Sequence, residues 1–431
     1  MKPIFRESMR RLEIHPISPP ALDEIAFKSL YTKEIYDVRT RDGWVLQISR
    51  YRPVRQAWDQ PIWDEPLVLV PGWSQNRHAF TCGDFVKRLL SYGADIHILE
   101  LRGHGRSSRE LQLERAATED RSPPKDLDWD WDIDSYFLED LPAGIDAVKK
   151  KTGRDKVYYV GNSMGGMLGY GYAASHDDLA GLVTIGAPSD IGRGFLGLRA
   201  LSLFGPALLN PIIDAACTAA SGVLKTQHLS ARVLRKLSFL ALDRVANLLV
   251  APGKKYAPVQ FRHVPVDLFL RTLAHAATEG NLKRYEVVAK FMGSLLNPSR
   301  VTASEFRWLL SQGGEKEPRR VVEQFARWIR NDEMKCYRTG FDYKEHYKDI
   351  ALPMAVIFGD LDKIASAQST HGIYRAARSE YLLWRPVKDN SHLELTMGYD
   401  IHQICEDVRN LVEYAAKREH ARKARLGPRA V

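Results

Sequence analysis

Residues 157–166 read Val-Tyr-Tyr-Val-Gly-Asn-Ser-Met-Gly-Gly and run into the helix-prone sequence Met167-Leu-Gly-Tyr-Gly-Tyr-Ala-Ala174. A short apolar run that ends in glycine is typical of a strand buried on both faces of a parallel sheet. The glycines at 161 and 165 stand two residues either side of Ser163, as expected of a very tight turn. The segment therefore predicts a strand, a sharp turn and a helix, which is the repeating unit of an α/β protein.

Similar apolar runs lie on both sides of this segment, separated by stretches with helical periodicity such as residues 80–90 and 145–151. We expect strands at residues 67–70, 95–100, 182–185, 354–358 and 381–384, and a hairpin made of residues 33–38 and 44–51. Strands that alternate with helices indicate a mostly parallel, doubly wound sheet.

This alternation stops between about residues 190 and 347, where only helical periodicity remains. We therefore expect one α/β core that carries a large helical cap. The expected division is an N-terminal extension at 1–30, a core at 31–190 and 350–416, a helical cap or lid insertion at 191–349, and a basic tail at 417–431. A last helix is expected over residues 401–417.

The composition is that of an ordinary globular protein, with 45% hydrophobic and 27% charged residues among 431. The formal net charge is +9, but the last fifteen residues hold six basic side chains and one acidic one, and so supply most of it. A nucleic-acid-binding body is not indicated.

Two further features concern the cellular setting. The cysteines at 82, 217, 336 and 405 lie far apart, which argues against a disulfide framework or a zinc site. The first residues are charged where a secretory signal would be apolar, and the apolar stretch 194–217 is interrupted by charged residues and prolines. We expect a cytoplasmic protein that needs no metal or other cofactor.

Ser163 has the sequence context of a nucleophile, because a G-x-S-x-G turn between strand and helix exposes the serine hydroxyl. Such a serine needs a base and an acid that orients the base. His392 follows the strand at 381–384 and Asp362 follows the strand at 354–358, so both are expected at the carboxyl edge of the sheet with Ser163. Asp190 is a rival for the acid, and Asp360 is expected to cap the loop or face solvent.

An oxyanion hole is expected beside Ser163. Val70-Pro-Gly-Trp-Ser74 follows a core strand, and Met164 opens a helix, so the backbone N–H groups of Trp73 and Met164 are the candidate donors. The apolar residues crowded just after residue 194 are candidates to line an acyl pocket, with core burial or contact with a lipid surface as alternatives. The substrate-binding candidates are Phe204, Leu201 and Leu208.

Several phrases resemble the α/β-hydrolase superfamily, and most of all its acid-lipase-like branch. They are Arg41-Asp-Gly-Trp-Val-Leu46, Leu101-Arg-Gly-His-Gly-Arg-Ser107, Asp140-Leu-Pro-Ala-Gly-Ile-Asp-Ala-Val148, Gln324-Phe-Ala-Arg-Trp-Ile-Arg330 and Leu352-Pro-Met-Ala-Val-Ile-Phe-Gly-Asp-Leu-Asp362. The resemblance implies cleavage of lipid or carboxylic esters through an acyl-enzyme beneath a helical cap, with Ser163, Asp362 and His392 at the triad positions. Asn162 departs from the histidine that this branch often carries before the nucleophile.

The leading hypothesis is a serine ester hydrolase that acts on an apolar small-molecule or lipid ester, with possible transient contact with a membrane surface and no nucleic acid partner. An acyltransferase with the same triad and a catalytically silent binding protein on this fold are the alternatives. His104 is expected to shape its loop rather than act as a base. The alternating acids Asp126 to Asp134 look superficially like a calcium loop, but Ile133 stands where that loop needs glycine.

Overall fold

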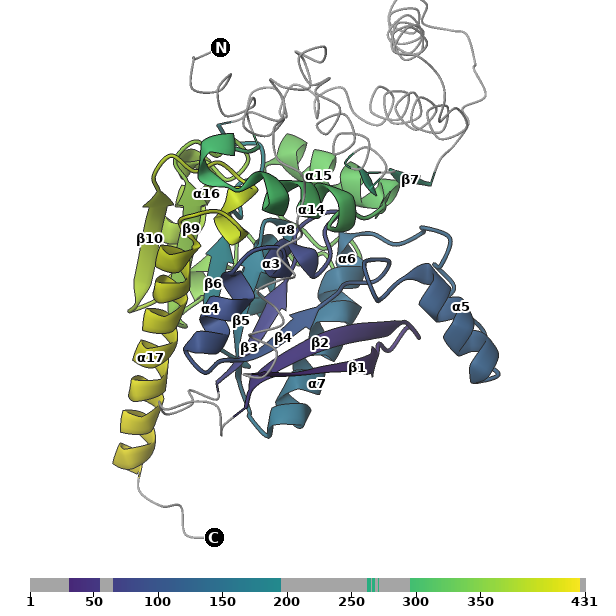
Figure 1. The fold of residues 1–431 in the computed structure, drawn as a ribbon, viewed down its shortest axis with the longest axis horizontal. Coiled ribbons are helices and arrows are strands. Elements are labelled where there is room, and N and C mark those ends of the chain that lie inside the picture. The colour runs from purple at the N-terminus through teal and green to yellow at the C-terminus, as the bar shows by residue number, and fades with distance from the viewer. Residues whose placement is uncertain are drawn as a thin grey trace, which may run out of the picture.

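The computed structural model describes residues 31–54, 65–194, 262–264, 266–267, 270 and 295–426. Eight strands form one sheet at the centre of the described molecule, with helices on both of its faces (Figure 1). In their order across the sheet they are β1 (Tyr31–Arg39), β2 (Val45–Pro53), β4 (Asp95–Leu99), β3 (Pro66–Val70), β5 (Val157–Asn162), β6 (Leu179–Ile185), β9 (Met354–Gly359) and β10 (Leu382–Val387).

The sheet is mostly parallel, which confirms the predicted fold class. β1 and β2 form an antiparallel hairpin in which Arg39 lies opposite Val45, and β2 is also antiparallel to β4. Every pair from β4 to β10 is parallel. β6 pairs directly with β9, although the whole 191–349 segment separates them along the chain.

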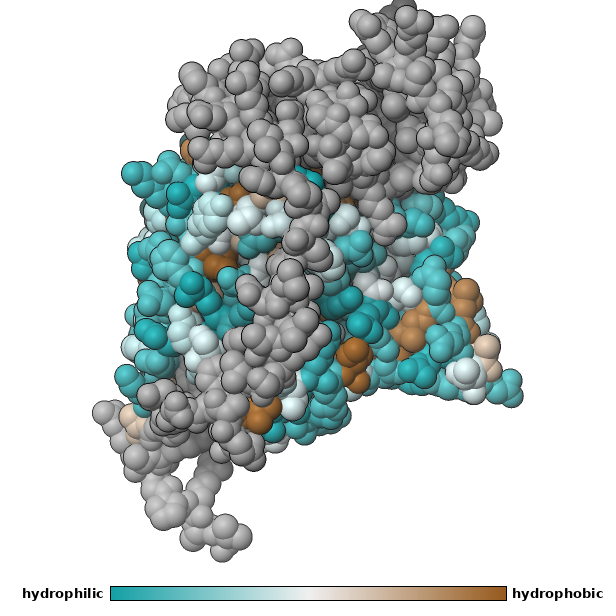
Figure 2. Space-filling model, viewed as in Figure 1, coloured by the Kyte–Doolittle hydropathy of each residue, from teal (hydrophilic) through white to brown (hydrophobic). Residues whose placement is uncertain are grey.

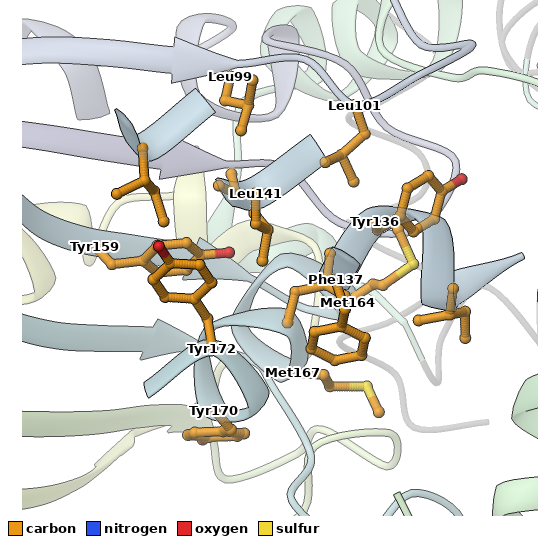
Figure 3. Packing of buried hydrophobic residues seen from close by; sticks show 14 of the residues in the cluster. Leu99, Leu101, Tyr136, Phe137, Leu141, Tyr159, Met164, Met167, Tyr170 and Tyr172 are labelled. Carbon is orange, nitrogen blue, oxygen red and sulfur yellow. The ribbon is translucent and has the colours of Figure 1, made fainter. Parts of the chain in front are cut away.

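Burial on both faces explains why the central strands are apolar throughout. In β3, Leu67 and Leu69 pack into one hydrophobic cluster, whereas Val68 and Val70 pack into another. Successive side chains of a strand point to opposite faces, so each face needs its own apolar residues. Figure 3 shows members of the cluster that contains Val68, among them Leu99, Leu141 and Tyr159.

The helices divide between these two faces according to the clusters they join. The cluster with Leu67 includes residues of α3 (His78–Thr81), α4 (Phe85–Ser91) and α17 (Ile401–Leu426). The cluster with Val68 includes residues of α7 (Leu141–Thr152), α8 (Met164–Ser175) and α16 (Ala367–Ala376). A π-helical turn, η2 (Tyr136–Asp140), joins α6 (Ile133–Ser135) to α7, and α5 (Arg109–Thr118) projects to one side (Figure 1).

The described part of the expected cap lies over the sheet edge where the parallel strands end (Figure 1). It comprises β7 (His263–Val264), η4 (Pro298–Arg300), α14 (Ala303–Gln312), β8 (Glu317–Pro318), α15 (Arg319–Asn331) and η5 (Tyr347–Asp349). Thr302 and Glu305 form a capping box that starts α14, a motif worth about 1 kcal/mol. The two-residue strands β7 and β8 pair antiparallel and were not expected from the helical periodicity.

Two boundaries differ from expectation. A helix was expected over residues 80–90, but α3 and α4 are separate, and a Cβ at Gly83 between them would lie 2.9 Å from the Met397 carbonyl oxygen. The last helix, α17, continues to Leu426 rather than ending at residue 417.

Among the described helices, none has the length and apolarity needed to cross a membrane. On the face shown in Figure 2, hydrophilic residues dominate the coloured surface and hydrophobic ones form small separate groups.

Candidate active site

Ser163 lies in the tight turn between β5 and α8, as its sequence context predicts. Its backbone angles are φ 48° and ψ −119°, which few residues other than glycine adopt. A Cβ at Gly161 would lie 2.4 Å from the Gly165 carbonyl oxygen, and one at Gly165 would lie 2.2 Å from the Val70 carbonyl oxygen. Both neighbours must therefore be glycine for α8 to start this close to β3 and β5.

The structure brings Ser163, His392 and Asp362 together in one hydrogen-bonded line. The Ser163 Oγ is 2.9 Å from the His392 Nε2, and the His392 Nδ1 is 2.7 Å from the Asp362 Oδ2. The other carboxylate oxygen of Asp362 accepts the backbone N–H groups of Ile364 and Ala365, at 2.8 and 2.9 Å. These bonds fix the carboxylate, which in turn orients the imidazole toward Ser163.

The charges around His392 favour its protonated form. Burial alone lowers the pKa of His392, but the charge and hydrogen bond of Asp362, together with the charge of Glu394, raise it above its ordinary value. A raised pKa makes the imidazole a stronger base toward the Ser163 hydroxyl.

Glu394 is buried in the same loop, and burial raises its pKa to about 7. Its Oε1 accepts the backbone N–H groups of Ser391 and Asn297, the second at 2.9 Å. Within the described ranges its Oε2 has no hydrogen-bond partner. The backbone N–H groups of His392 and Leu393 both donate to the Leu295 carbonyl oxygen, so the histidine loop is joined to the expected cap at residues 295–297.

The loop after β3 passes beside Ser163, which is the position expected of an oxyanion loop. A Cβ at Gly72 would lie 2.9 Å from the Ser163 Cβ, so the backbone at residues 72 and 73 closely approaches the serine. Met164 is the first residue of α8, where a backbone N–H has no partner within its own helix. Trp73 follows Gly72 and Met164 follows Ser163, so their backbone N–H groups remain the candidate oxyanion donors.

Ser74, the next residue of this loop, has a left-handed conformation with φ 56° and is buried. All three of its polar groups bond to the cap segment 315–317. Its N–H donates to the Glu317 Oε1 at 2.7 Å, its Oγ donates to the Glu315 carbonyl oxygen, and its carbonyl oxygen accepts the Glu315 N–H at 2.9 Å.

The side chain of His104 contacts a carboxylate of the expected cap. The His104 Nε2 lies 3.1 Å from the Glu317 Oε1, and both side chains are buried. Burial alone lowers the pKa of His104, but Glu317, and after it Glu315 and Asp140, raise it above its ordinary value.

The other candidate acids have different surroundings. Asp190 is buried, and its Oδ1 lies 2.5 Å from the Lys344 Nζ, so it belongs to an ion pair between the core and the 191–349 segment. Asp360 is exposed, as expected. Asp362 is the acid that bonds to His392.

The alternating acids that resemble a calcium loop bind cations and amides of the protein itself. Asp126 joins Asp42 and Asp140 around the buried guanidinium of Arg102. The other four bond to residues of the expected cap. Asp128 pairs with Arg262, and Asp130 pairs with Arg320. Asp132 pairs with both Arg320 and Arg338, and Asp134 accepts a hydrogen bond from the Gln324 side chain. The tryptophans Trp129, Trp131 and Trp328 are buried in the core, and Trp308 packs on the cluster around α14.

The predicted substrate-binding residues Phe204, Leu201 and Leu208 lie outside the described residues. Sequence reasoning missed the supporting residues Glu317, Glu394 and Ser74. No motif surrounds Glu317, whereas the position of Glu394, two residues after the candidate base, is a signal that could have found it.

The comparisons with known proteins can now be set beside this geometry. A family model for the alpha/beta hydrolase fold matches residues 65–204. Among curated proteins, the tear acid lipase-like protein of Mesocricetus auratus is 22% identical over 401 residues, 89% of this chain and 88% of that protein. Lipase lipl-3 of Caenorhabditis elegans is 24% identical over 44% of this chain, and lipase member N of Mus musculus is 28% identical over 36%. The chain spans only 46% and 38% of the lengths of these last two.

Solved structures with related folds include a membrane phospholipase A, with a TM-score of 0.47, 13% identity and coverage of 92% of this chain and 91% of that one. The monoacylglycerol lipase of Paleococcus ferrophilus has a TM-score of 0.45, 12% identity and coverage of 86% and 98%.

The sheet order, the turn at Ser163 and the family match define the class of protein, which is an α/β hydrolase. Within that superfamily, the curated proteins that the chain resembles include an acid lipase-like protein and other proteins named lipases.

Proposed function

We propose that this protein is a serine ester hydrolase that cleaves apolar acyl esters through an acyl-enzyme on Ser163. The observation that carries the proposal is the continuous hydrogen-bonded line from the Ser163 Oγ through His392 to the Asp362 carboxylate. That arrangement supports nucleophilic catalysis by serine on any fold that presents it. The lipase names of the relatives favour lipid esters as the substrate class.

In the proposed mechanism, the Ser163 Oγ attacks the acyl carbon while the His392 Nε2 takes the hydroxyl proton. The carbonyl oxygen of the ester becomes an oxyanion and accepts hydrogen bonds from the N–H groups of Trp73 and Met164. The tetrahedral species then expels the alcohol, which receives the proton from His392. A water molecule, deprotonated by His392, attacks the acyl-enzyme, and collapse of the second tetrahedral species releases the acid and restores Ser163.

The segment 191–349 is proposed to cap this site. Its described residues support that role, because residues 295–297 bond to the histidine loop and residues 312–317 bond to the loop after β3.

The test is hydrolysis of p-nitrophenyl esters with acyl chains of two to sixteen carbons, together with labelling by a fluorophosphonate probe. We expect ester turnover and covalent labelling that both disappear in Ser163→Ala, with the melting temperature retained. His392→Ala should lose a similar share of activity, and the double variant little more, because the two residues act as a unit. A rate peak beyond eight carbons would support a lipase-like pocket.

Other outcomes would contradict parts of the proposal. More than a tenth of wild-type activity in Ser163→Ala would refute the mechanism. Fluorophosphonate labelling without ester hydrolysis, together with transfer of a substrate's acyl group to an added alcohol or thiol, would indicate an acyltransferase. Neither labelling nor turnover would indicate a silent binding protein.

A further inference from the structure

The loop that carries the Trp73 N–H is supported from two directions. On the core side, the Arg77 N–H donates to the Glu100 carboxylate at 3.0 Å. On the cap side, the Asn76 N–H donates to the Gly313 carbonyl oxygen at 3.2 Å, and Ser74 bonds through all its polar groups to residues 315–317. The loop therefore takes its shape from side chains and backbone far away in the sequence.

The conformation of Ser74 makes this support necessary. A serine with φ 56° lies in the left-handed region, which costs energy for a residue with a side chain and persists only where the surroundings impose it. The Glu317 carboxylate is fully buried and accepts the Ser74 N–H directly. Trp73 immediately precedes Ser74, so a change in the backbone of Ser74 would move the Trp73–Ser74 peptide and, through the φ and ψ angles of Trp73, the preceding peptide that includes the Trp73 N–H.

Glu317 is itself fixed by core residues. Its Oε1 also faces His104, and its Oε2 accepts the Tyr136 hydroxyl at 3.3 Å. Tyr136 in turn accepts the Trp131 indole N–H at 3.0 Å. A buried carboxylate with this many partners cannot move without leaving several polar groups unpaired.

We propose that Glu317 is a positioning residue for the oxyanion hole: it fixes Ser74 in its left-handed conformation and thereby directs the Trp73 N–H toward the oxyanion. This inference rests on the proposed function of Ser163. It also gives the insertion a role in the chemical step, because one of its residues determines the geometry of a transition-state contact.

The test compares Glu317→Met, which is nearly isosteric but has no acceptor, with Glu317→Gln, which retains an acceptor oxygen for the Ser74 N–H. Loss of one oxyanion donor costs about 10²–10³ in kcat, so we expect Glu317→Met to lose about tenfold to a hundredfold in kcat with KM within about twofold. Glu317→Gln should retain kcat within about fivefold of wild type. Inhibition by an alkyl trifluoromethyl ketone, whose adduct with Ser163 carries an oxyanion, should weaken in Glu317→Met by the same factor as kcat.

Asp134→Leu is the matched control. Asp134 is another buried acid that joins core to insertion, but its carboxylate bonds to Gln324 and to the N–H groups of Tyr337 and Arg338. We expect this variant to lower the melting temperature with kcat within about threefold of wild type. Equal kcat losses in Glu317→Met and Asp134→Leu, or a loss confined to KM, would overturn the proposal.

Glu317→Asp covers the case in which Glu317→Met does not fold, because it keeps a carboxylate in this buried site while its shorter side chain withdraws that carboxylate from Ser74. It should lose about tenfold in kcat and in ketone affinity, and full kcat would refute the inference. Such an outcome, in an enzyme that hydrolyses esters through Ser163, would leave the proposed function intact. Wild-type protein that neither hydrolyses esters nor reacts with the fluorophosphonate would refute the proposed function instead.

Discussion

Two loops flank Ser163, and each is supported by a buried glutamate in different electrostatic surroundings. In the loop after β3, Glu317 lies 3.1 Å from His104, which supplies a positive charge when protonated. In the histidine loop, Glu394 accepts only backbone N–H groups among its described hydrogen-bond partners, and Asp362 adds negative charge nearby. The comparison teaches that the surroundings of a buried glutamate decide its role. Among backbone N–H groups, Glu394 titrates near neutrality, whereas beside a histidine, Glu317 can form an ion pair.

The largest effect should come from the acid on the histidine side. We expect Asp362→Asn to lower kcat at least about a hundredfold, because the imidazole loses both its orientation and the charge that stabilises its protonated form. Asp190→Asn is the control, and it should cost less than about tenfold, since Asp190 bonds to Lys344 rather than to His392. Steady-state kinetics on a p-nitrophenyl ester would check both variants, and the reverse ranking would transfer the role of acid to Asp190.

The next effect concerns stability and separates the two glutamates. The pKa of Glu394 is raised to about 7 in the folded protein, so its neutral form contributes stability below about pH 4.5 that is lost as the pH rises to about 7. Glu394→Gln removes this loss. The difference in free energy of unfolding between this variant and wild type should therefore increase in favour of the variant by on the order of 3 kcal/mol from pH 4 to pH 8. Urea unfolding at the two pH values measures it.

Glu317→Gln should destabilise the protein rather than stabilise it, and over a different range of pH. The folded-state pKa of His104 is raised, mainly by Glu317 against the effect of burial, so this stability is fully present below pH 6.5 and is lost as the pH rises through the folded pKa. The variant should therefore be destabilised most below pH 6.5. A Glu317→Gln variant that matched wild type below pH 6.5 and was more stable than wild type at high pH, as Glu394→Gln is expected to be, would disprove the electrostatic difference between the two loops.

A smaller effect is expected on the pH dependence of catalysis. His392 must be neutral to take a proton, and its pKa is raised, so kcat/KM should fall as the pH falls through a value above 6.5. Glu394→Gln removes one of the charges that raise this pKa and should therefore shift the fall to lower pH. Glu406→Gln, an exposed change of the same charge on α17, should leave the profile in place.

The smallest effect should come from a third attachment of the cap, at the surface. Arg320 is half exposed and lies 2.8 Å from Asp130 and 3.3 Å from Asp132. Exposed ion pairs contribute about 0.2–1 kcal/mol, so Arg320→Gln should lower the free energy of unfolding by no more than about 1 kcal/mol, and less in high salt. Losses of several kcal/mol would show that this contact matters as much as the buried glutamates.

The residues of the proposed triad could be found from the sequence because each depends on local features. Ser163, Asp362 and His392 each follow an apolar strand, and parallel strands bring such positions to one edge. Glu317 could not be found in this way, since its contact with Ser74 joins residues 243 positions apart and no local pattern encodes it.

The helices and strands that differ from the sequence-based expectations do so for physical reasons that can be named. The tail was expected to begin at residue 417 because of its charge, but alanines among the basic residues favour helix, and α17 continues to Leu426. β8 is only two residues long, which is too short to show periodicity, and it precedes α15 directly. The break between α3 and α4 depends on close approach to Met397, more than 300 residues away.

The pairing of β6 with β9 has a consequence for biosynthesis. Leu182 lies opposite Met354, so β6 leaves the ribosome roughly 170 residues before its neighbour. At about 5–20 residues per second, that interval lasts roughly 10–35 seconds. During it the apolar strand β6 has an open edge, which is a template for pairing with other chains. Chaperone binding to stalled nascent chains should therefore be strongest for lengths that end within the insertion, and should decline once β9 has emerged.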